Sequence, residues 1–236
     1  MRWLLISWVM LTVVMNLQAQ EGVVLLHGMC RTAGSMKKME TALQQTGFTV
    51  LNVDYPSRTA SVDELSDAAI GQALANPVLK DCVKVNFVTH SLGGILVRNF
   101  FKRHVDARLG RVVMLGPPNQ GSEVVDELGS WWMFRKLNGP AGGELGTGAD
   151  STPNKLGSVS FELGVIAGDR SINWINSCMI KGSDDGKVSV ERTKVAGMKE
   201  HVVVHATHPF LMKDKTAISY MIRFLKTGTF GKASVK

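Results

Sequence analysis

Hydrophobic and polar positions follow two periods along the chain, and the two periods alternate. Short apolar runs that end in glycine, proline or a polar residue are typical of strands buried on both faces of a parallel sheet. Six such runs follow the first 20 residues, and each predicts a strand. They cover 22–28, 48–56, 83–90, 111–121, 159–169 and 201–208.

Helical spacing separates these runs, as in Met36, Met39 and Leu43, which recur at intervals of three and four residues. The second helical segment opens with a serine that has a glutamate three residues on, which is the capping-box pattern. The last segment carries proline in its first turn. The predicted helices cover 35–47, 61–76, 92–104 and 209–228.

Strands that alternate with helices predict an α/β fold, a mainly parallel sheet with helices on both faces joined by right-handed crossovers. With 236 residues, 44% of them hydrophobic, we expect one domain over 20–236. From about 120 to 157 the pattern breaks down into a Gly-rich stretch, which predicts a small cap-like insertion. Ligands of such sheets bind at the carboxyl ends of the strands, where His27, Asp54 and Ser91 lie.

The first 19 residues have the layout of a secretory signal peptide. Arg2 precedes an uncharged apolar run from Trp3 to Met15, and small and polar residues follow. A membrane span needs roughly 20 apolar residues, more than this run has. We expect export to the periplasm or the medium. The alternative is a membrane anchor by an uncleaved leader, because Leu17 interrupts the small-residue cleavage pattern.

Export would place Cys30, Cys82 and Cys178 in an oxidising compartment. Cys30 follows one predicted strand and Cys82 precedes another, so in a parallel sheet we expect them at opposite ends and too far apart to bond. A disulfide would therefore use Cys178. Three free, buried thiols are the alternative.

The net charge of +7 is a modest basic excess. Bases such as Lys102, Arg103, Arg108 and Arg111 are interspersed with apolar residues, without the aromatic interleaving of a nucleic-acid surface. We expect no nucleic-acid partner, and the charge is compatible with contact to an anionic membrane surface.

A reactive serine is predicted in the segment NFVTHSLGGILVR, residues 86–98. Ser91 lies between a predicted strand and a predicted helix, in a variant of the Gly-x-Ser-x-Gly elbow with Thr89 in place of the first glycine. A modest side chain is tolerated there if the neighbouring strand leaves space, whereas Gly93 provides the closer approach on the helix side. A serine hydroxyl becomes a nucleophile when a base takes its proton, so a histidine and an acid are required.

The histidine should follow the last strand. His208 lies just beyond it and reaches the site most easily, whereas His201 opens the strand and His205, within it, is expected to be packed. His27 and His90 are expected to be structural, the first bracing the loop after the first strand and the second pointing away from the serine.

The acid should lie on a loop between the serine and the histidine, where Asp169, Asp184 and Asp185 compete. The expected oxyanion donors are two backbone N–H groups. One belongs to Leu92, the residue after the serine, and the other to Met29, in the loop after the first strand.

Six segments together carry a resemblance to a known family: VVLLHGMCRTAGSM, VLNVDYPSR, VNFVTHSLGGILVR, VVMLGPPNQGSE, SDDGKVSVERT and HATHPFLM. They span nearly the whole chain after the leader and resemble the α/β-hydrolase superfamily, within it the bacterial lipase/esterase-like group. The resemblance implies a Ser–Asp–His triad and an acyl-enzyme. Lipases of this kind carry the acid in an N/D-D-G-x-V loop, which matches Asp185 before Gly186 and favours it over Asp184 and Asp169.

The predicted function is hydrolysis of small-molecule or lipid esters by Ser91, Asp185 and His208, with Met29 and Leu92 at the oxyanion. Acyl transfer or thioester hydrolysis on the same triad, and an exported binding protein without turnover, are the alternatives. No cofactor is expected. No metal is expected either, since neither the adjacent aspartates nor the histidine pair provides three ligands at familiar spacing.

An apolar cluster in the insertion comprises Trp131, Trp132, Met133 and Phe134. If these side chains are exposed beside the site, they would bind an acyl chain or contact lipid. If they turn inward, they are core.

Overall fold

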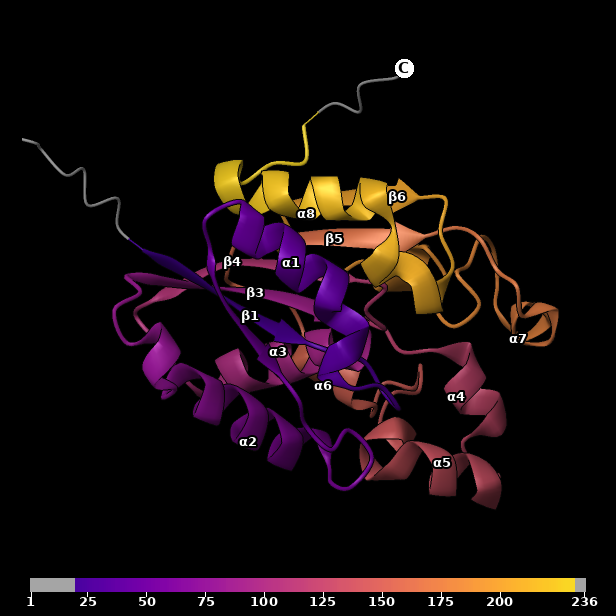
Figure 1. The fold of residues 1–236 in the computed structure, drawn as a ribbon. Coiled ribbons are helices and arrows are strands. Elements are labelled where there is room, and N and C mark those ends of the chain that lie inside the picture. Colours follow the sequence, from indigo (N-terminus) through magenta and orange to yellow (C-terminus); the bar gives the residue numbers. More distant parts are fainter. Residues whose placement is uncertain (1–19, 232–236) are drawn as a thin grey trace, which may run out of the picture.

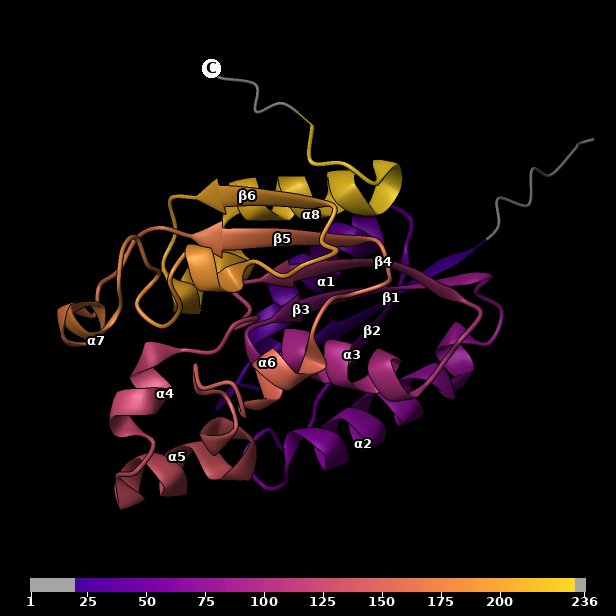
Figure 2. The ribbon, with the colours of Figure 1, turned by 180° about the vertical axis from the view of Figure 1, so that it is seen from behind.

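The computed structural model describes residues 20–231, so the expected leader at 1–19 lies outside the described residues. Six parallel strands form one sheet in the order β2-β1-β3-β4-β5-β6 (Figures 1 and 2). The parallel sheet expected from the alternating pattern is confirmed. The strands are β1 (Glu21–Leu26), β2 (Thr49–Val53), β3 (Lys84–His90), β4 (Leu109–Leu115), β5 (Leu163–Gly168) and β6 (Glu200–Val204).

Helices cover both faces of this sheet (Figure 1). On one face lie α1 (Lys37–Gln45) and α8 (Lys215–Thr227), and on the other lie α2 (Val62–Leu74) and α3 (Leu92–Arg103). The capping box predicted for the second helix is formed at the start of α2. The doubly covered sheet agrees with the predicted fold class.

Alternate residues of the central strands contribute to two separate apolar layers. Val23 and Leu25 of β1 pack in the layer with α1 and α8, whereas Val24 and Leu26 pack in the layer with α2 and α3. Because both faces are buried, the strands read as continuous hydrophobic runs in the sequence.

The end of the chain differs from the prediction. The single closing helix expected at 209–228 is two elements, a 3-10 helix η4 (His208–Lys213) and then α8, which is capped by the Asp214 side chain. Pro209 therefore lies in the short helix. β6 ends at Val204, so His205 follows the strand and is exposed rather than packed.

The segment 120–157, expected to be irregular, contains three short helices. α4 (Glu123–Leu128) and α5 (Trp132–Gly143) lie beyond the carboxyl ends of the strands, near α7 (Trp174–Met179), and α6 (Thr152–Leu156) contacts α3 (Figures 1 and 2). We call the segment 120–157 the cap segment. Within residues 20–231, no helix is both long and apolar enough to cross a membrane.

The three cysteines are all free thiols. The disulfide considered for Cys178 is therefore not formed. The alternative of three buried thiols holds only for Cys82, because Cys30 and Cys178 are exposed.

Candidate active site

The turn from β3 into α3 holds Ser91 in a strained backbone conformation, with φ 52° and ψ −120°. The Ser91 N–H donates to Leu115 O at 2.9 Å, which ties the turn to the neighbouring strand β4. A Cβ atom at Gly93 would lie 2.7 Å from Leu26 O of β1, so only glycine fits on the helix side. Thr89, by contrast, is fully buried between β1 and β4. The sheet therefore has room for threonine at that position of the elbow.

Ser91, His208 and Asp185 form a continuous hydrogen-bonded chain. His208 Nε2 lies 3.0 Å from Ser91 Oγ, and His208 Nδ1 lies 2.7 Å from Asp185 Oδ2. Asp185 is 1% exposed, and its Oδ1 accepts the N–H groups of Lys187 at 3.0 Å and Val188 at 2.9 Å. A backbone hydrogen bond also connects the two residues, since the His208 N–H donates to Asp185 O at 2.8 Å. This carboxylate is thus fixed from both sides and orients the imidazole.

The two other candidate acids lie apart from Ser91. Asp184 Oδ1 accepts the Gly186 N–H at 2.7 Å and the Ser177 hydroxyl at 2.8 Å, so it shapes the loop that carries Asp185. Asp169 Oδ1 lies 2.9 Å from Nδ1 of the exposed His205. Within the described residues, neither of these carboxylates hydrogen-bonds to His208.

His90 supports His208 from the side. The two rings lie 4.7 Å apart, and His90 Nε2–H donates to His208 O at 3.0 Å. Burial lowers the pKa of His90 well below its ordinary value, and the charges of His208 and then Arg31 lower it further. His90 is therefore a neutral donor that holds the backbone of His208.

The loop after β1 is braced by His27. Its Nδ1–H donates to Gly28 O at 2.9 Å, and its Nε2 accepts the Tyr55 N–H at 3.3 Å. The Tyr55 ring stacks on His27 at 4.2 Å, and its hydroxyl donates to His27 O at 2.6 Å. Burial lowers the pKa of His27, although the carboxylate of Asp54 nearby opposes this shift. The bracing role expected for His27 agrees with these contacts.

Two backbone N–H groups beside Ser91 are available to a ligand. Those of Met29 and Leu92 make no hydrogen bond with any residue that the structure describes. Leu92 begins α3, so its N–H lies at the positive end of the helix dipole. Met29 lines the same cavity as Ser91. Both residues thus carry an unbonded backbone donor at the margin of the site.

A cavity of about 390 Å³ opens at Ser91 and His208. Its apolar lining comes mainly from the cap segment, and Val188, on the loop of Asp185, adds to it. Phe134 is the member of the predicted apolar cluster that lines the cavity. Trp131, Trp132 and Met133 are exposed, at 51%, 64% and 39%. The cavity-lining residues of the cap segment that the sequence did not reveal are Ser122, Val124, Val125, Asn138, Gly142 and Leu145. Their spacing carries no signal of a cavity.

Within residues 20–231, no group of three or more His, Cys, Asp or Glu side chains is arranged to hold a metal ion.

Solved structures share this fold. The mature form of the lipase BlEst2 of Bacillus licheniformis matches with a TM-score of 0.71 at 19% identity, over 90% of this chain and 93% of that chain. The phospholipase PlaB of Legionella pneumophila matches with a TM-score of 0.71 at 18% identity, over 89% of this chain and 60% of the PlaB chain. A structure from work on the metagenome-derived lipolytic enzymes LipS and LipT matches with a TM-score of 0.62 at 14% identity, over 88% of this chain and 94% of that chain.

Sequence comparison decides the family. A search of curated protein sequences finds no match. Residues 23–174, more than half of the chain, match the model of the Alpha/beta hydrolase family. The matched region includes Met29 and Ser91 and ends before Asp185 and His208, which the structure brings to the same place. The chain belongs to the alpha/beta hydrolase family.

Proposed function

We propose that the protein is a serine hydrolase that cleaves carboxylic esters with an apolar acyl group through an acyl-enzyme. The observation that carries this proposal is the hydrogen-bonded chain from Ser91 through His208 to Asp185 at the edge of a cavity with apolar walls. Family membership supports it, and so do the structural neighbours named as lipases or esterases.

In the first half-reaction, Ser91 Oγ attacks the ester carbonyl while His208 Nε2 accepts the serine proton. Asp185 holds the imidazole through Nδ1–H and stabilises the imidazolium. The alcohol leaves with the proton from His208, and water activated by the same imidazole then releases the acid. The N–H groups of Met29 and Leu92 donate to the oxyanion in both steps. This scheme needs no cofactor.

We assign the acyl chain to the cavity lined by Phe134 and the apolar residues of α4. Trp131 and Trp132 precede Phe134 and expose about half or more of their surface, 51% and 64%. They suit contact with a lipid surface that presents the ester, since indole rings favour such interfaces.

The test is a chain-length series of p-nitrophenyl esters on wild type and on Ser91→Ala. Ser91→Ala should lower kcat by about 10⁴-fold or more, because the nucleophile is lost while the cavity remains. Ser158→Ala is the matched control, since Ser158 is exposed and its hydroxyl has no hydrogen bond within the described residues. It should retain wild-type rates.

Covalent labelling separates a hydrolase from a binding protein with the same fold. A fluorophosphonate should label wild type at Ser91, as mapped by peptide mass, and should not label Ser91→Ala. Hydrolysis that survives in Ser91→Ala, or a folded wild-type protein that resists labelling, contradicts the proposal.

A further inference from the structure

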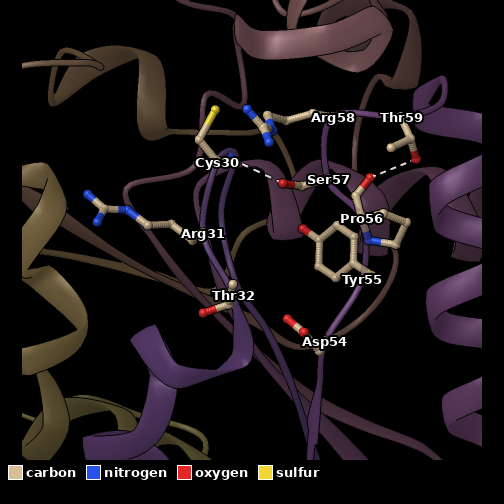
Figure 3. Close-up of a pocket in the computed structure, with 9 residues that line it drawn as sticks. All are labelled: Cys30, Arg31, Thr32, Asp54, Tyr55, Pro56, Ser57, Arg58 and Thr59. Atoms are coloured by element: carbon tan, nitrogen blue, oxygen red, sulfur yellow. Dashed lines mark hydrogen bonds between the residues drawn. The ribbon is translucent and has the colours of Figure 1, made fainter.

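A second cavity, of about 520 Å³, is lined by nine residues that Figure 3 shows as sticks. Its walls come from the loops that follow β1 and β2, which are neighbours in the sheet. Cys30 and Arg31 line both cavities. The two cavities therefore adjoin at Cys30 and Arg31.

The second cavity is positively charged. Arg31 and Arg58 are exposed, and neither guanidinium makes a hydrogen bond or an ion pair with any residue that the structure describes. Asp54 is the acidic residue among its lining, and this carboxylate already accepts the Ala33 N–H at 2.9 Å and lies 3.4 Å from His27 Nε2. In the view of Figure 3, the Arg58 guanidinium lies beside Cys30, the Arg31 side chain extends outward to the left, and Asp54 lies at the other end, near Thr32 and Tyr55.

The walls of this cavity are fixed by the core and by the cap segment. The Cys30 N–H donates to the buried Ser57 hydroxyl at 3.1 Å, which joins the two loops. The Cys30 thiol donates to Leu137 O of α5 at 3.2 Å. At Gly139, where φ is 67°, a Cβ atom would lie 1.9 Å from Arg58 O, so α5 sits directly on the backbone of Arg58. The backbone that carries Arg31 and Arg58 is therefore held in place by these contacts.

The position of Arg31 links this charge to the reaction site. Its positive charge contributes to the lowered pKa of His90, after burial and after the charge of His208. His90 packs against His208, which contacts Ser91. Arg31 thus lies close enough for its charge to act on His90, and it lines the cavity of Ser91 as well as the second cavity.

We propose that the second cavity binds a phosphate group carried by the alcohol part of the ester, with Arg31 and Arg58 as its ligands. Two guanidinium forks and the Thr32 hydroxyl, which is unbonded within the described chain, offer more donors than a carboxylate can accept, and a phosphate monoester accepts them through three oxygens. The inference rests on the proposed function and narrows its substrate to phosphate-bearing acyl esters.

The phosphate takes no part in the covalent step. The bond between the acyl carbon and the alcohol oxygen breaks, the bond between the acyl carbon and Ser91 Oγ forms, and the alcohol leaves with the proton from His208 and its phosphate intact. Water completes the cycle. The two arginines act by binding and positioning the leaving group.

The first test compares decanoylglycerol 3-phosphate with decanoylglycerol, which share the acyl chain and the glycerol. The ratio of kcat/KM for the phosphate-bearing ester to that for the neutral one should fall about tenfold in Arg58→Gln, because hydrogen bonds to a charged group are lost. Arg31→Gln should also lower this ratio. Arg170→Gln is the matched control, an exposed arginine that lines neither cavity, and should keep the wild-type ratio.

The second test does not depend on turnover. In Ser91→Ala protein, isothermal titration below the micelle concentration should show tighter binding of the phosphate-bearing ester, and Arg58→Gln in that background should remove the difference. Absence of hydrolysis in wild type would contradict the proposed function and leave this binding result to decide the phosphate site.

Two outcomes overturn the inference. One is a ratio that stays at the wild-type value in Arg31→Gln, in Arg58→Gln and in the double variant. The other is competition by inorganic phosphate that is equal for both esters, with no preference between them, because that would make the cavity a site for a free anion.

Discussion

Two aspartates of this chain hydrogen-bond a histidine through the same ring atom, Nδ1, yet the two pairs lie in opposite surroundings. Asp185 and His208 are buried, and the carboxylate also accepts two backbone N–H groups. Asp169 pairs with His205, whose side chain is 74% exposed. An exposed pair is screened by water and contributes little, whereas a buried one fixes the orientation of the ring.

This contrast predicts opposite responses to the same substitution. Asp185→Asn should lower kcat/KM by about 10³- to 10⁴-fold, because the amide does not stabilise the imidazolium and permits the wrong tautomer of His208. Asp169→Asn should stay within about twofold of wild type, since its partner is in solvent. Steady-state kinetics on one p-nitrophenyl ester measures both. Equal losses in the two variants would show that Asp185 is not the orienting acid.

At the scale of elements, the kink in α5 holds the cap segment against the loop after β2. Gly139 adopts a φ of 67° and lies against Arg58 O, and the Ala141 N–H that follows donates to Ala60 O at 3.2 Å. Gly143, at the end of the same helix, has open space around its missing Cβ. Alanine substitutions at Gly139 and Gly143 can therefore be compared within one helix, one at a tight contact and one in open space.

Gly139→Ala should lower the free energy of unfolding by about 1–3 kcal/mol, because alanine is strained at this φ and its Cβ meets a carbonyl. It should also reduce kcat/KM for long acyl esters, since α5 carries Phe134. Gly143→Ala should be neutral or stabilising by up to about 1 kcal/mol. Urea unfolding of the three proteins, with kinetics on a long and a short ester, checks this. Identical behaviour of the two variants would contradict the role of the kink.

The elements that sequence patterns predicted well are those whose burial repeats regularly. The sequence pattern predicts all six strands and the helices α1, α2 and α3, because the central strands bury residues in both layers and each of these helices buries one face. The helices of the cap segment are not predictable in this way, because tertiary contacts stabilise them and their apolar residues follow no regular period. Arg98 of α3 is buried and donates to the carbonyls of Asn119, Pro153 and Gly157 at 2.8, 3.0 and 2.7 Å. An arginine in a helix gives no sequence signal of such a role.

At the scale of the whole molecule, two buried histidines, His27 and His90, and the partly buried His201 link stability to pH. Burial lowers the pKa of His27, His90 and His201 below the ordinary value of 6.5. Below about pH 6.5 the unfolded chain takes up protons that the folded protein does not, so the free energy of unfolding falls as pH falls. The contribution of these histidines to the free energy of unfolding is fully present above the ordinary histidine pKa of 6.5.

Urea unfolding between about pH 7.5 and about pH 5.5 should therefore show a loss of about 1 kcal/mol per pH unit from His90 alone in the acidic part of the range. His201→Gln should reduce the slope, since one of the three groups is removed. A free energy of unfolding that stays constant over this range would contradict the prediction.

The candidate site was predictable where chemistry is encoded in local sequence. The elbow at Ser91 and the loop of Asp185 each occupy one short segment, and the order of strands places their ends together. The second cavity was not predictable, because Arg31 and Arg58 belong to different loops and their unpaired state depends on the neighbours that each side chain lacks. Only the folded arrangement shows that two ordinary surface arginines line one cavity.

The strand order also sets when, during synthesis, the protein acquires reactivity. β6 is an edge of the sheet, and His208 follows it, 117 residues after Ser91. On the proposed mechanism, a ribosome-bound chain exposes its nucleophile long before it has the base that deprotonates it. The emerging polypeptide is chemically inert toward surrounding esters until its outermost strand docks.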